Sequence, residues 1–214
     1  MDKKYWNKYY KNHGEDIEIS KPSSFAQFIN KEYLQKKKFK IVELGSGNGR
    51  DAIYFANLSH NVIALDQSIQ AIENKKKNLH KNINKFLHPK AVDFINEDYN
   101  EYNKIDIFYS RFSLHSITKK DEIILLPKIY NSLNRNGLLC IEVRTTKDPL
   151  FGIGQQCGQN TFMHDNHKRR FIESTTFRVE AQNLGFKELF FIEKDNLSIY
   201  KNDNPVLMRI ILQK

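Results

Sequence analysis

Residues 43–51 read Glu-Leu-Gly-Ser-Gly-Asn-Gly-Arg-Asp. They follow an apolar run, 39–44, and precede a helical pattern, 52–58, so they lie where a buried strand turns into a helix. Three glycines at alternate positions permit a tight turn and let the backbone approach a ligand closely. The N–H groups at the start of the following helix then face that ligand. The stretch therefore predicts a loop that binds a nucleotide-type cofactor.

Two common phosphate-binding patterns are missing from this loop. A dinucleotide-binding loop has Gly-x-Gly-x-x-Gly, but the third glycine position counted from Gly45 is Arg50. A P-loop needs Gly-Lys followed by Ser or Thr, and that sequence does not occur here. Asp66 ends the next predicted strand, where a carboxylate accepts hydrogen bonds from ribose hydroxyls. These features favour an adenosyl ligand without phosphate groups.

Strand and helix patterns alternate from residue 39 onward, which predicts an α/β fold with a mostly parallel sheet and helices on both faces. No helix pattern separates the last two strands, so their short connection predicts an antiparallel last strand. The expected fold is a Rossmann-like, seven-stranded sheet in one domain, 39–214. The predicted strands are 39–44, 60–65, 90–92, 105–109, 138–143, 186–193 and 206–212. The predicted helices are 51–57, 68–79, 119–134 (with Pro127 inside it and Gly137 just past its end) and 171–183.

Two segments stand outside this alternation. Residues 1–38 predict a small N-terminal cap of two helices, one with an aromatic stripe and one that begins at Ser23 or Ser24. The cap either packs against the edge of the domain or closes over the cofactor as a lid. Residues 145–170 fit no regular element, and long connections of this kind are usually functional. Because this segment leaves the carboxyl end of a strand, it predicts a loop that bounds the substrate pocket.

Composition limits the location and the partners of the protein. The formal net charge is +9, which suits nucleic acid, an anionic membrane or an acidic small substrate, or simply reflects a Lys- and Asn-rich composition. The placement of the lysines favours the last reading, so a nucleic-acid partner is not expected. No apolar run approaches ~18 residues, so no membrane span is expected. The absence of a signal-peptide pattern and the presence of only two cysteines, Cys140 and Cys157, predict a cytoplasmic protein.

Taken together, the motifs resemble those of class I S-adenosylmethionine-dependent methyltransferases. The resemblance rests on residues 42–49, on Ala64-Leu65-Asp66-Gln67-Ser68 and on Asp93-Phe94. It implies S-adenosyl-L-methionine as the cofactor. For the methionine and ribose, it implies that Gly45 and Gly47 line these groups and that Asp66 binds both ribose hydroxyls. For the adenine, it implies that Gln67 lies beside the ring, that Asp93 binds the amino group and that Phe94 offers its N–H or its ring. It further implies that the Ser110 carbonyl binds the methionine ammonium and that Glu43 supports that region.

Two residues after the fourth predicted strand are candidates for the reaction itself. His115 is a candidate general base, because the reference pKa of histidine is near 6.5. Alternatively, it orders the loop through a bond to a backbone carbonyl. Arg111 binds a substrate anion, or it braces Asp66 or Glu142 structurally.

A second polar cluster, 164–170, provides candidate substrate contacts. Its histidines could ligate a metal, but no suitable third ligand is spaced for one, and no metal is expected. An anion site is favoured, because guanidinium groups bind phosphate-like anions well. The alternative is a basic flank of the helix that follows. The candidate substrate-binding residues are His164, His167, Arg169 and Arg170.

The segments around Arg111 and His164 together resemble those of methyltransferases that modify bacterial capsule or surface polysaccharides at phosphoramidate or phosphate groups. This resemblance implies O-methylation of a small or glycan-linked anionic acceptor. Two alternatives remain open: an RNA methyltransferase, although the Asn/Asp-Pro-Pro-Tyr/Phe signature is absent, and a non-catalytic protein that binds the cofactor. The oligomeric state does not follow from the sequence.

Overall fold

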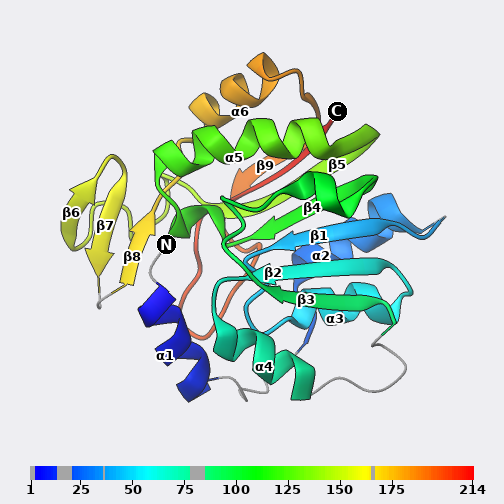
Figure 1. The fold of residues 1–214 in the computed structure, drawn as a ribbon. Helices are drawn as coiled ribbons and strands as arrows, with labels where there is room; N and C mark the ends of the chain where they lie inside the picture. Colours follow the sequence, from blue (N-terminus) through cyan, green and yellow to red (C-terminus); the bar gives the residue numbers. More distant parts are fainter. Residues whose placement is uncertain (1–2, 14–20, 36, 78–84, 165–166) are drawn as a thin grey trace.

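The central sheet has the strand order β3-β2-β1-β4-β5-β10-β9 (Figure 1). The computed structural model describes residues 3–13, 21–35, 37–77, 85–164 and 167–214. Neighbouring strands from β3 to β5 are parallel, whereas β10 is antiparallel to both β5 and β9. This confirms the predicted α/β, Rossmann-like sheet of seven strands with an antiparallel last strand. The strands are β1 Lys40–Leu44, β2 Asn61–Asp66, β3 Leu87–Ala91, β4 Ile105–Arg111, β5 Leu133–Arg144, β9 Lys187–Lys194 and β10 Leu207–Gln213.

Helices cover both faces of this sheet. On one face α5 and α6 bury side chains such as Ile129 and Phe177 in the same apolar cluster as Val42 of β1. On the other face α2 and α3 bury Phe25 and Phe55 together with Ile41, the neighbour of Val42, because successive side chains of a strand point to opposite faces. The helices are α1 Lys3–His13, α2 Ser24–Ile29, α3 Arg50–Asn57, α4 Ile69–Lys77, α5 Lys119–Ser132 and α6 Ser174–Asn183, with the shorter helical turns η2 Asn30–Leu34, η3 Tyr99–Tyr102 and η4 Leu114–Ser116.

One network ties α2 to the start of α3, directly behind the glycine loop. Ser23 caps α2, as one of the two predicted options has it, and its side chain accepts a hydrogen bond from the Ala26 amide at 3.0 Å. The Ser23 amide and hydroxyl donate to the buried carboxylate of Asp51 at 2.7 and 2.8 Å. The Tyr109 hydroxyl of β4 donates to the same carboxylate at 2.8 Å. Hydrogen bonds from the N-cap of α2 and from β4 therefore hold the start of α3, directly behind the cofactor loop, in place.

The segment 145–170 corrects the sequence analysis, because it contains regular structure. Its described residues form an antiparallel sheet of β6 Gln155–Gly158, β7 Thr161–His164 and β8 His167–Arg170. These strands are mostly exposed or half-buried, so they lack the apolar alternation by which a strand is recognised. The rings of Phe151, Phe162 and Phe171 pack against one another at centroid distances of 5.4 to 6.2 Å and anchor this sheet.

Several element boundaries also differ from the prediction. The helix predicted at 119–134 ends at Ser132, because Leu133 is already extended and pairs with Ile105. Gly137 therefore lies inside β5, and Asn136 takes the left-handed conformation at φ 64°. The helix predicted to begin at 171 begins at Ser174, because the Glu173 carboxylate caps it. The strand predicted at 90–92 is Leu87–Ala91, and the strand predicted at 105–109 continues to Arg111, so that Ser110 lies within it.

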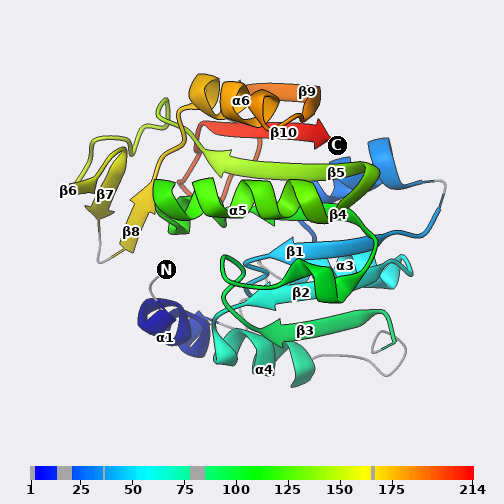
Figure 2. The same cartoon turned by 45° about the horizontal axis from the view of Figure 1, so that its top comes forward.

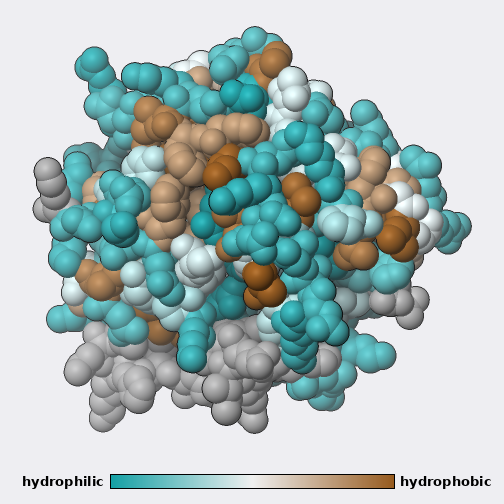
Figure 3. All heavy atoms as spheres, turned by 180° about the vertical axis from the view of Figure 1, so that it is seen from behind, coloured by the Kyte–Doolittle hydropathy of each residue, from teal (hydrophilic) through white to brown (hydrophobic). Residues whose placement is uncertain are grey.

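Figure 2 shows β1, β3 and β5 pointing toward the side of the molecule on which α1 and the small sheet lie, with β10 running the other way. Ligands in open α/β sheets bind beyond the carboxyl ends of the strands. Seen from behind the view of Figure 1, the surface is mostly hydrophilic, with several apolar patches among the polar residues (Figure 3). Within the described ranges, no helix is both long and apolar enough to cross a lipid bilayer.

Candidate functional site

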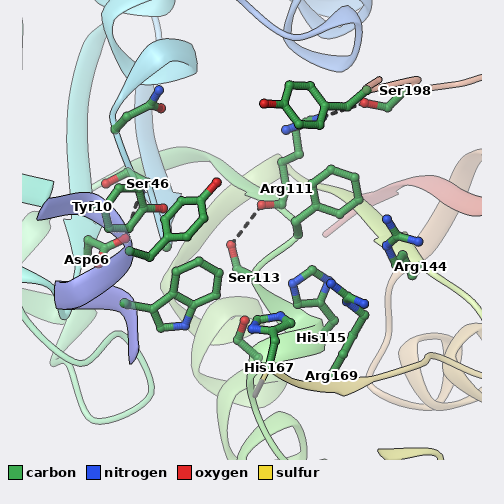
Figure 4. A pocket seen from close by; sticks show the side chains of 18 of the residues that line it. Tyr10, Ser46, Asp66, Arg111, Ser113, His115, Arg144, His167, Arg169 and Ser198 are labelled. Carbon is green, nitrogen blue, oxygen red and sulfur yellow. Dashed lines mark hydrogen bonds between the residues drawn. The ribbon is translucent and has the colours of Figure 1, made fainter. Parts of the chain in front are cut away.

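A cavity of about 630 Å³ lies at the carboxyl ends of the parallel strands. Its walls come from the glycine loop, from α1, from η4, from the small sheet and from the connection between β9 and β10. Figure 4 shows Tyr10, Ser46 and Asp66 on one side of the cavity and His115, His167, Arg169 and Arg144 on the other. We call the first side the cofactor half and the second the acceptor half.

The glycine loop of the cofactor half turns as its sequence predicts. Gly45 and Gly47 have φ values of 65° and 51°, in the left-handed region that side chains disfavour. The Ser46 amide donates to the Leu65 carbonyl at 2.8 Å, which fastens the loop to the end of β2. The hydroxyl of Tyr10 packs directly over Gly47, so a Cβ atom at this position would clash. Glycine is therefore favoured there by the left-handed backbone geometry, whereas the clash would involve only the far end of the Tyr10 side chain.

Asp66 holds this loop in shape and borders the cavity. Its carboxylate accepts hydrogen bonds from the Gly47 amide and the Ser68 amide, both at 2.8 Å. Ser68 in turn donates to Asn7 of α1 at 2.7 Å, so the N-terminal helix is fastened next to the same site. A carboxylate accepts up to about four bonds, so two backbone amides leave capacity for ligand hydroxyls. A carboxylate acceptor at this position fits the ribose hydroxyls of an adenosyl group without phosphates.

The other predicted cofactor residues fall into two groups. Glu43, Gln67 and Phe94 line the cavity together with Gly45 and Gly47. Among the described residues no group pairs with Nε2 of Gln67, although this atom is buried, so a donor is left at the predicted adenine end. Asp93 is exposed and lies outside the cavity wall, and its carboxylate accepts from the Ile95 amide at 3.1 Å. Ser110 is buried in β4, also outside the wall.

Aromatic side chains of α1 cover the cavity. Tyr5 and Trp6 contact the His167 ring at centroid distances of 4.8 and 5.3 Å, in the acceptor half. Tyr10 lies in the cofactor half, where burial and the nearby Asp66 carboxylate raise the pKa of its phenol well above the usual value. One helix therefore touches both halves of the cavity.

His115 lies at the floor of the acceptor half, nearly buried on η4. Burial, followed by the neighbouring cations led by Arg169, lowers the pKa of its imidazole well below 6.5, so the ring is neutral at pH 7. Its Nδ1 is buried and has no hydrogen-bond partner within the described part of the chain. The Phe112 ring stacks on it at 5.7 Å, and Phe112 itself has φ 56°. Backbone strain at a bulky residue is typical of functional sites.

Arg169 and Arg170 have separate environments, although they are adjacent. Arg169 lines the cavity, and burial lowers the pKa of its guanidinium, with Arg144 contributing next. No carboxylate of the described residues forms an ion pair with it, and its buried Nε has no partner there. Arg170 lies outside the cavity wall. It donates to the Glu122 carboxylate at 2.5 Å and to the Ile117 carbonyl at 2.9 Å. Its predicted contact with substrate is thereby corrected, because its side chain is committed to holding η4 and α5.

The two histidines of the small sheet also line the cavity. His164 of β7 and His167 of β8 are register partners in the small sheet. The rings of His167 and His115 lie 6.0 Å apart, so two distant segments meet in the acceptor half. Among the described residues, no three His, Cys, Asp or Glu side chains are grouped to hold a metal ion.

Arg111 serves as a brace to Glu142, one of the options that the sequence left open. Its Nε donates to the fully buried Glu142 carboxylate at 2.7 Å, and its Nη2 donates to the Ser198 hydroxyl at 2.7 Å. Arg209 of β10 donates to the other oxygen of Glu142 at 2.5 Å. One carboxylate therefore holds two guanidinium groups, and Arg111 still borders the cavity.

The sequence analysis missed a wall of the acceptor half formed by residues 195–205, which we call the strap. Ser198, Ile199, Tyr200 and Asp203 of the strap line the cavity. Arg144, also missed, donates to Asp203 and, at 3.0 Å, to Asp148. The sheet topology could have predicted the position of the strap. Because β10 is antiparallel, the residues before it lie at the same edge of the sheet as the carboxyl ends of the parallel strands.

Comparisons with known proteins agree with this architecture. A family model described as a methyltransferase domain matches residues 35–183. No curated protein sequence matches the chain. The solved structure of the glycopeptide N-methyltransferase MtfA has a TM-score of 0.69, at 13% identity over 91% of this chain and 97% of its own. An S-adenosylmethionine-dependent methyltransferase from Methanosarcina mazei has a TM-score of 0.73, at 15% identity over 87% of this chain and 96% of its own.

A third similar structure is that of the 1,6-didemethyltoxoflavin-N1-methyltransferase from Burkholderia thailandensis. Its TM-score is 0.67, at 13% identity over 96% of this chain and 84% of its own. At such identities these likenesses show the fold, while the family model spans most of the chain. The predictions of a methyltransferase and of S-adenosylmethionine as its cofactor are thereby confirmed. The chain belongs to the methyltransferase domain family.

Proposed function

We propose that this methyltransferase methylates an oxygen of a small or glycan-linked anionic acceptor, of the phosphate or phosphoramidate type found in surface polysaccharide biosynthesis. The observation that carries the proposal is Arg169, a cation that lines the cavity without a carboxylate partner among the described residues. A desolvated guanidinium is stabilised when a bound anion compensates its charge. The polar ring atoms of His115, His164 and His167 supply further hydrogen-bonding groups around the same position.

The residues of the cofactor half would hold the methyl donor. When bound, S-adenosylmethionine supplies an activated methyl group. Asp66 would accept bonds from the ribose hydroxyls, while Gln67 and Phe94 border the adenine and Gly45, Gly47 and Glu43 line the remainder. The helix α1 acts as the lid of the N-terminal cap, with Tyr5 and Trp6 excluding water from the reacting groups.

His115 is suited to receive a proton only after an anion has entered. Burial, and then the charges of Arg169 and the other nearby cations, lower the pKa of its imidazole while no anion is bound. A bound anion adds negative charge nearby and raises the pKa of the imidazole. A hydroxyl nucleophile would give its proton to His115, whereas an ionised phosphate oxygen needs no base. Neutral His115 thus accommodates both kinds of oxygen acceptor.

Electrostatics favour this acceptor over a protonated amine. An ammonium group would be repelled by Arg169, whose charge no carboxylate of the described residues offsets as an ion pair.

The two cysteines are unpaired, with Cys140 buried and Cys157 exposed, which supports the expected cytoplasmic location.

The test is a transfer assay with methyl-labelled S-adenosylmethionine and a panel of phosphorylated and phosphoramidate acceptors. Small amines and single-stranded RNA serve as the comparison acceptors. We expect label only in anionic small molecules or glycans. Label in RNA that increases at low salt would contradict the proposal, as would label in amines alone. Binding of S-adenosylhomocysteine with no transfer to any acceptor would support the non-catalytic alternative instead.

A further inference from the structure

The strap, residues 195–205, is held rigidly although it is a connection without regular structure. Tyr200 and Asp203 exchange backbone hydrogen bonds of 3.0 and 2.9 Å, which closes a turn. At its base, the Asn204 side chain accepts from the Asn196 amide at 2.9 Å and donates to the Asn196 side chain at 3.1 Å. The strap is therefore preorganised, and little entropy is lost when a ligand contacts it.

Three arginines fix the strap to the central sheet. Arg111 donates to the Ser198 hydroxyl and Arg209 to the Leu197 carbonyl, at 2.7 and 2.8 Å. Arg144, at the end of β5, pairs with Asp203. These bonds hold the cavity side of the strap opposite His115 and Arg169, as Figure 4 shows for Ser198.

The cavity side of the strap combines apolar and accepting groups. Ile199 and Tyr200 are 61% and 40% exposed, and both line the cavity. The Asp203 side chain is 47% exposed, and its carboxylate can accept more bonds than Arg144 donates. A flat aromatic ring next to a carboxylate suits a ligand that has an apolar ring face and hydroxyl groups at its edge.

The geometry points to the strap as the subsite for a polyhydroxylated ring, such as a sugar, that carries the anionic group. Tyr200 and Ile199 would pack on the ring face, and the Asp203 carboxylate would accept its hydroxyls. The anionic group then lies at Arg169, across the cavity. This inference rests on the proposed function and specifies its substrate class: a sugar phosphate or phosphoramidate rather than a free anion or an alkyl phosphate.

Binding experiments without turnover test the subsite, with S-adenosylhomocysteine bound. The probes are inorganic phosphate, cyclohexyl phosphate and glucose 1-phosphate. Dissociation constants come from calorimetry and from the fluorescence of Trp6, which is the single tryptophan of the chain and lines the cavity. We expect glucose 1-phosphate to bind about tenfold more tightly than either other probe, as one or two added hydrogen bonds and a ring contact would give.

Variants separate the strap from the anion site. Tyr200→Ala should remove the advantage of glucose 1-phosphate over inorganic phosphate and leave the affinity for inorganic phosphate unchanged. Asp203→Ala should remove the tighter binding of glucose 1-phosphate relative to cyclohexyl phosphate. Arg144 still has its ion pair with Asp148 in this variant. Leu189→Ala is the matched control, because Leu189 is 38% exposed on β9 and lies outside the cavity.

The outcomes distinguish this inference from the proposed function. Equal affinities of the three probes, or a Tyr200→Ala variant that keeps the full preference for glucose 1-phosphate, would overturn the sugar subsite. Cyclohexyl phosphate binding as tightly as glucose 1-phosphate would overturn it too. If Arg169→Met leaves the affinity for inorganic phosphate unchanged, the anion site of the proposed function fails instead.

Discussion

The two halves of the cavity are built in different ways. The cofactor half comes from short stretches that follow β1, β2 and β3, and its key contacts involve backbone amides such as those of Gly47 and Ser68. The acceptor half is assembled from side chains of segments that are distant in the sequence, among them those of Arg111, Arg144, Arg169 and the strap. The comparison teaches that the cofactor half is formed largely by residues close together in the sequence, whereas the acceptor half depends on tertiary structure. Four predictions test this division.

The largest effect is expected from Asp66→Ala. Loss of two charge-assisted hydrogen bonds to ribose, at ~1.5–3 kcal/mol each, should weaken binding of S-adenosylhomocysteine by about 100-fold or more. Calorimetry measures the dissociation constant. The matched carboxylate is Asp93, which is exposed outside the cavity wall, and Asp93→Ala should weaken binding by less than about tenfold. Equal losses in the two variants would show that the cofactor half is wrongly assigned.

The next largest effect concerns the support of the acceptor half. Glu142→Gln leaves Arg111 and Arg209 as buried cations without their shared carboxylate, which typically costs about 3–5 kcal/mol of stability. Urea unfolding measures this loss. The variant should nevertheless bind S-adenosylhomocysteine within about threefold of the original affinity at temperatures where it is folded. A large loss of cofactor affinity would mean that the two halves are not independent.

A smaller effect is expected from Arg169→Met. Removing a charge-assisted hydrogen bond of ~1.5–3 kcal/mol should raise the KM of the anionic acceptor by about 10- to 150-fold. The dissociation constant of S-adenosylhomocysteine should stay the same. Arg135→Met is the control, because Arg135 is exposed near the opposite end of β5. An unchanged KM in Arg169→Met would refute the anion site, whatever happens to the cofactor.

The smallest effect is a dependence of stability on pH. The pKa of His115 is lowered in the folded protein, so below pH 6.5 the unfolded chain binds a proton that the folded chain does not. Its contribution to stability is therefore intact above pH 6.5 and declines as the pH falls, by up to about 1.4 kcal/mol per pH unit. Unfolding free energies between pH 7.5 and 5.0 should decline less steeply in His115→Gln than in the original protein.

His60 provides the comparison for this measurement. Burial lowers its pKa to about 4, so it adds acid sensitivity of the same sign, but it lies outside the main cavity. Inorganic phosphate should flatten the pH dependence of the original protein and of His60→Gln, because a bound anion raises the pKa of His115. If phosphate has no effect in either protein, His115 and the anion site are not coupled.

The turn of the glycine loop and the position of Asp66 beside it could be predicted from the sequence for a physical reason. A glycine turn followed by a helix start, and a carboxylate at the end of the next strand, are fixed by neighbours within about 20 residues. The mostly parallel direction of the strands followed from the alternation of patterns, and the antiparallel last strand from the short connection before it. The boundary errors arose where no local signal exists, as at Leu133, where pairing with β4 ends the helix.

The acceptor half could be predicted only in part. Arg111, His115, His164, His167 and Arg169 were named because they lie near strand ends or in a basic cluster, and all line the cavity. Nothing in the sequence separates Arg169 from Arg170, since only the alternation of β8 turns one toward the cavity and the other toward Glu122. The strap follows only when the predicted antiparallel last strand is combined with the edge at which the parallel strands end, because no local residue pattern marks it.

The insertion of β10 between β5 and β9 has a consequence for synthesis on the ribosome. Residues 40–144 contain the glycine loop, Asp66 and the whole parallel part of the sheet, and they emerge before Arg209 does. At about 5–20 residues per second, several seconds separate the two events. During that interval β5 is an unpaired edge strand, and Glu142 has no Arg209 to bind. The residues that the proposed function assigns to the methyl donor are therefore synthesised before the strap that borders the acceptor half.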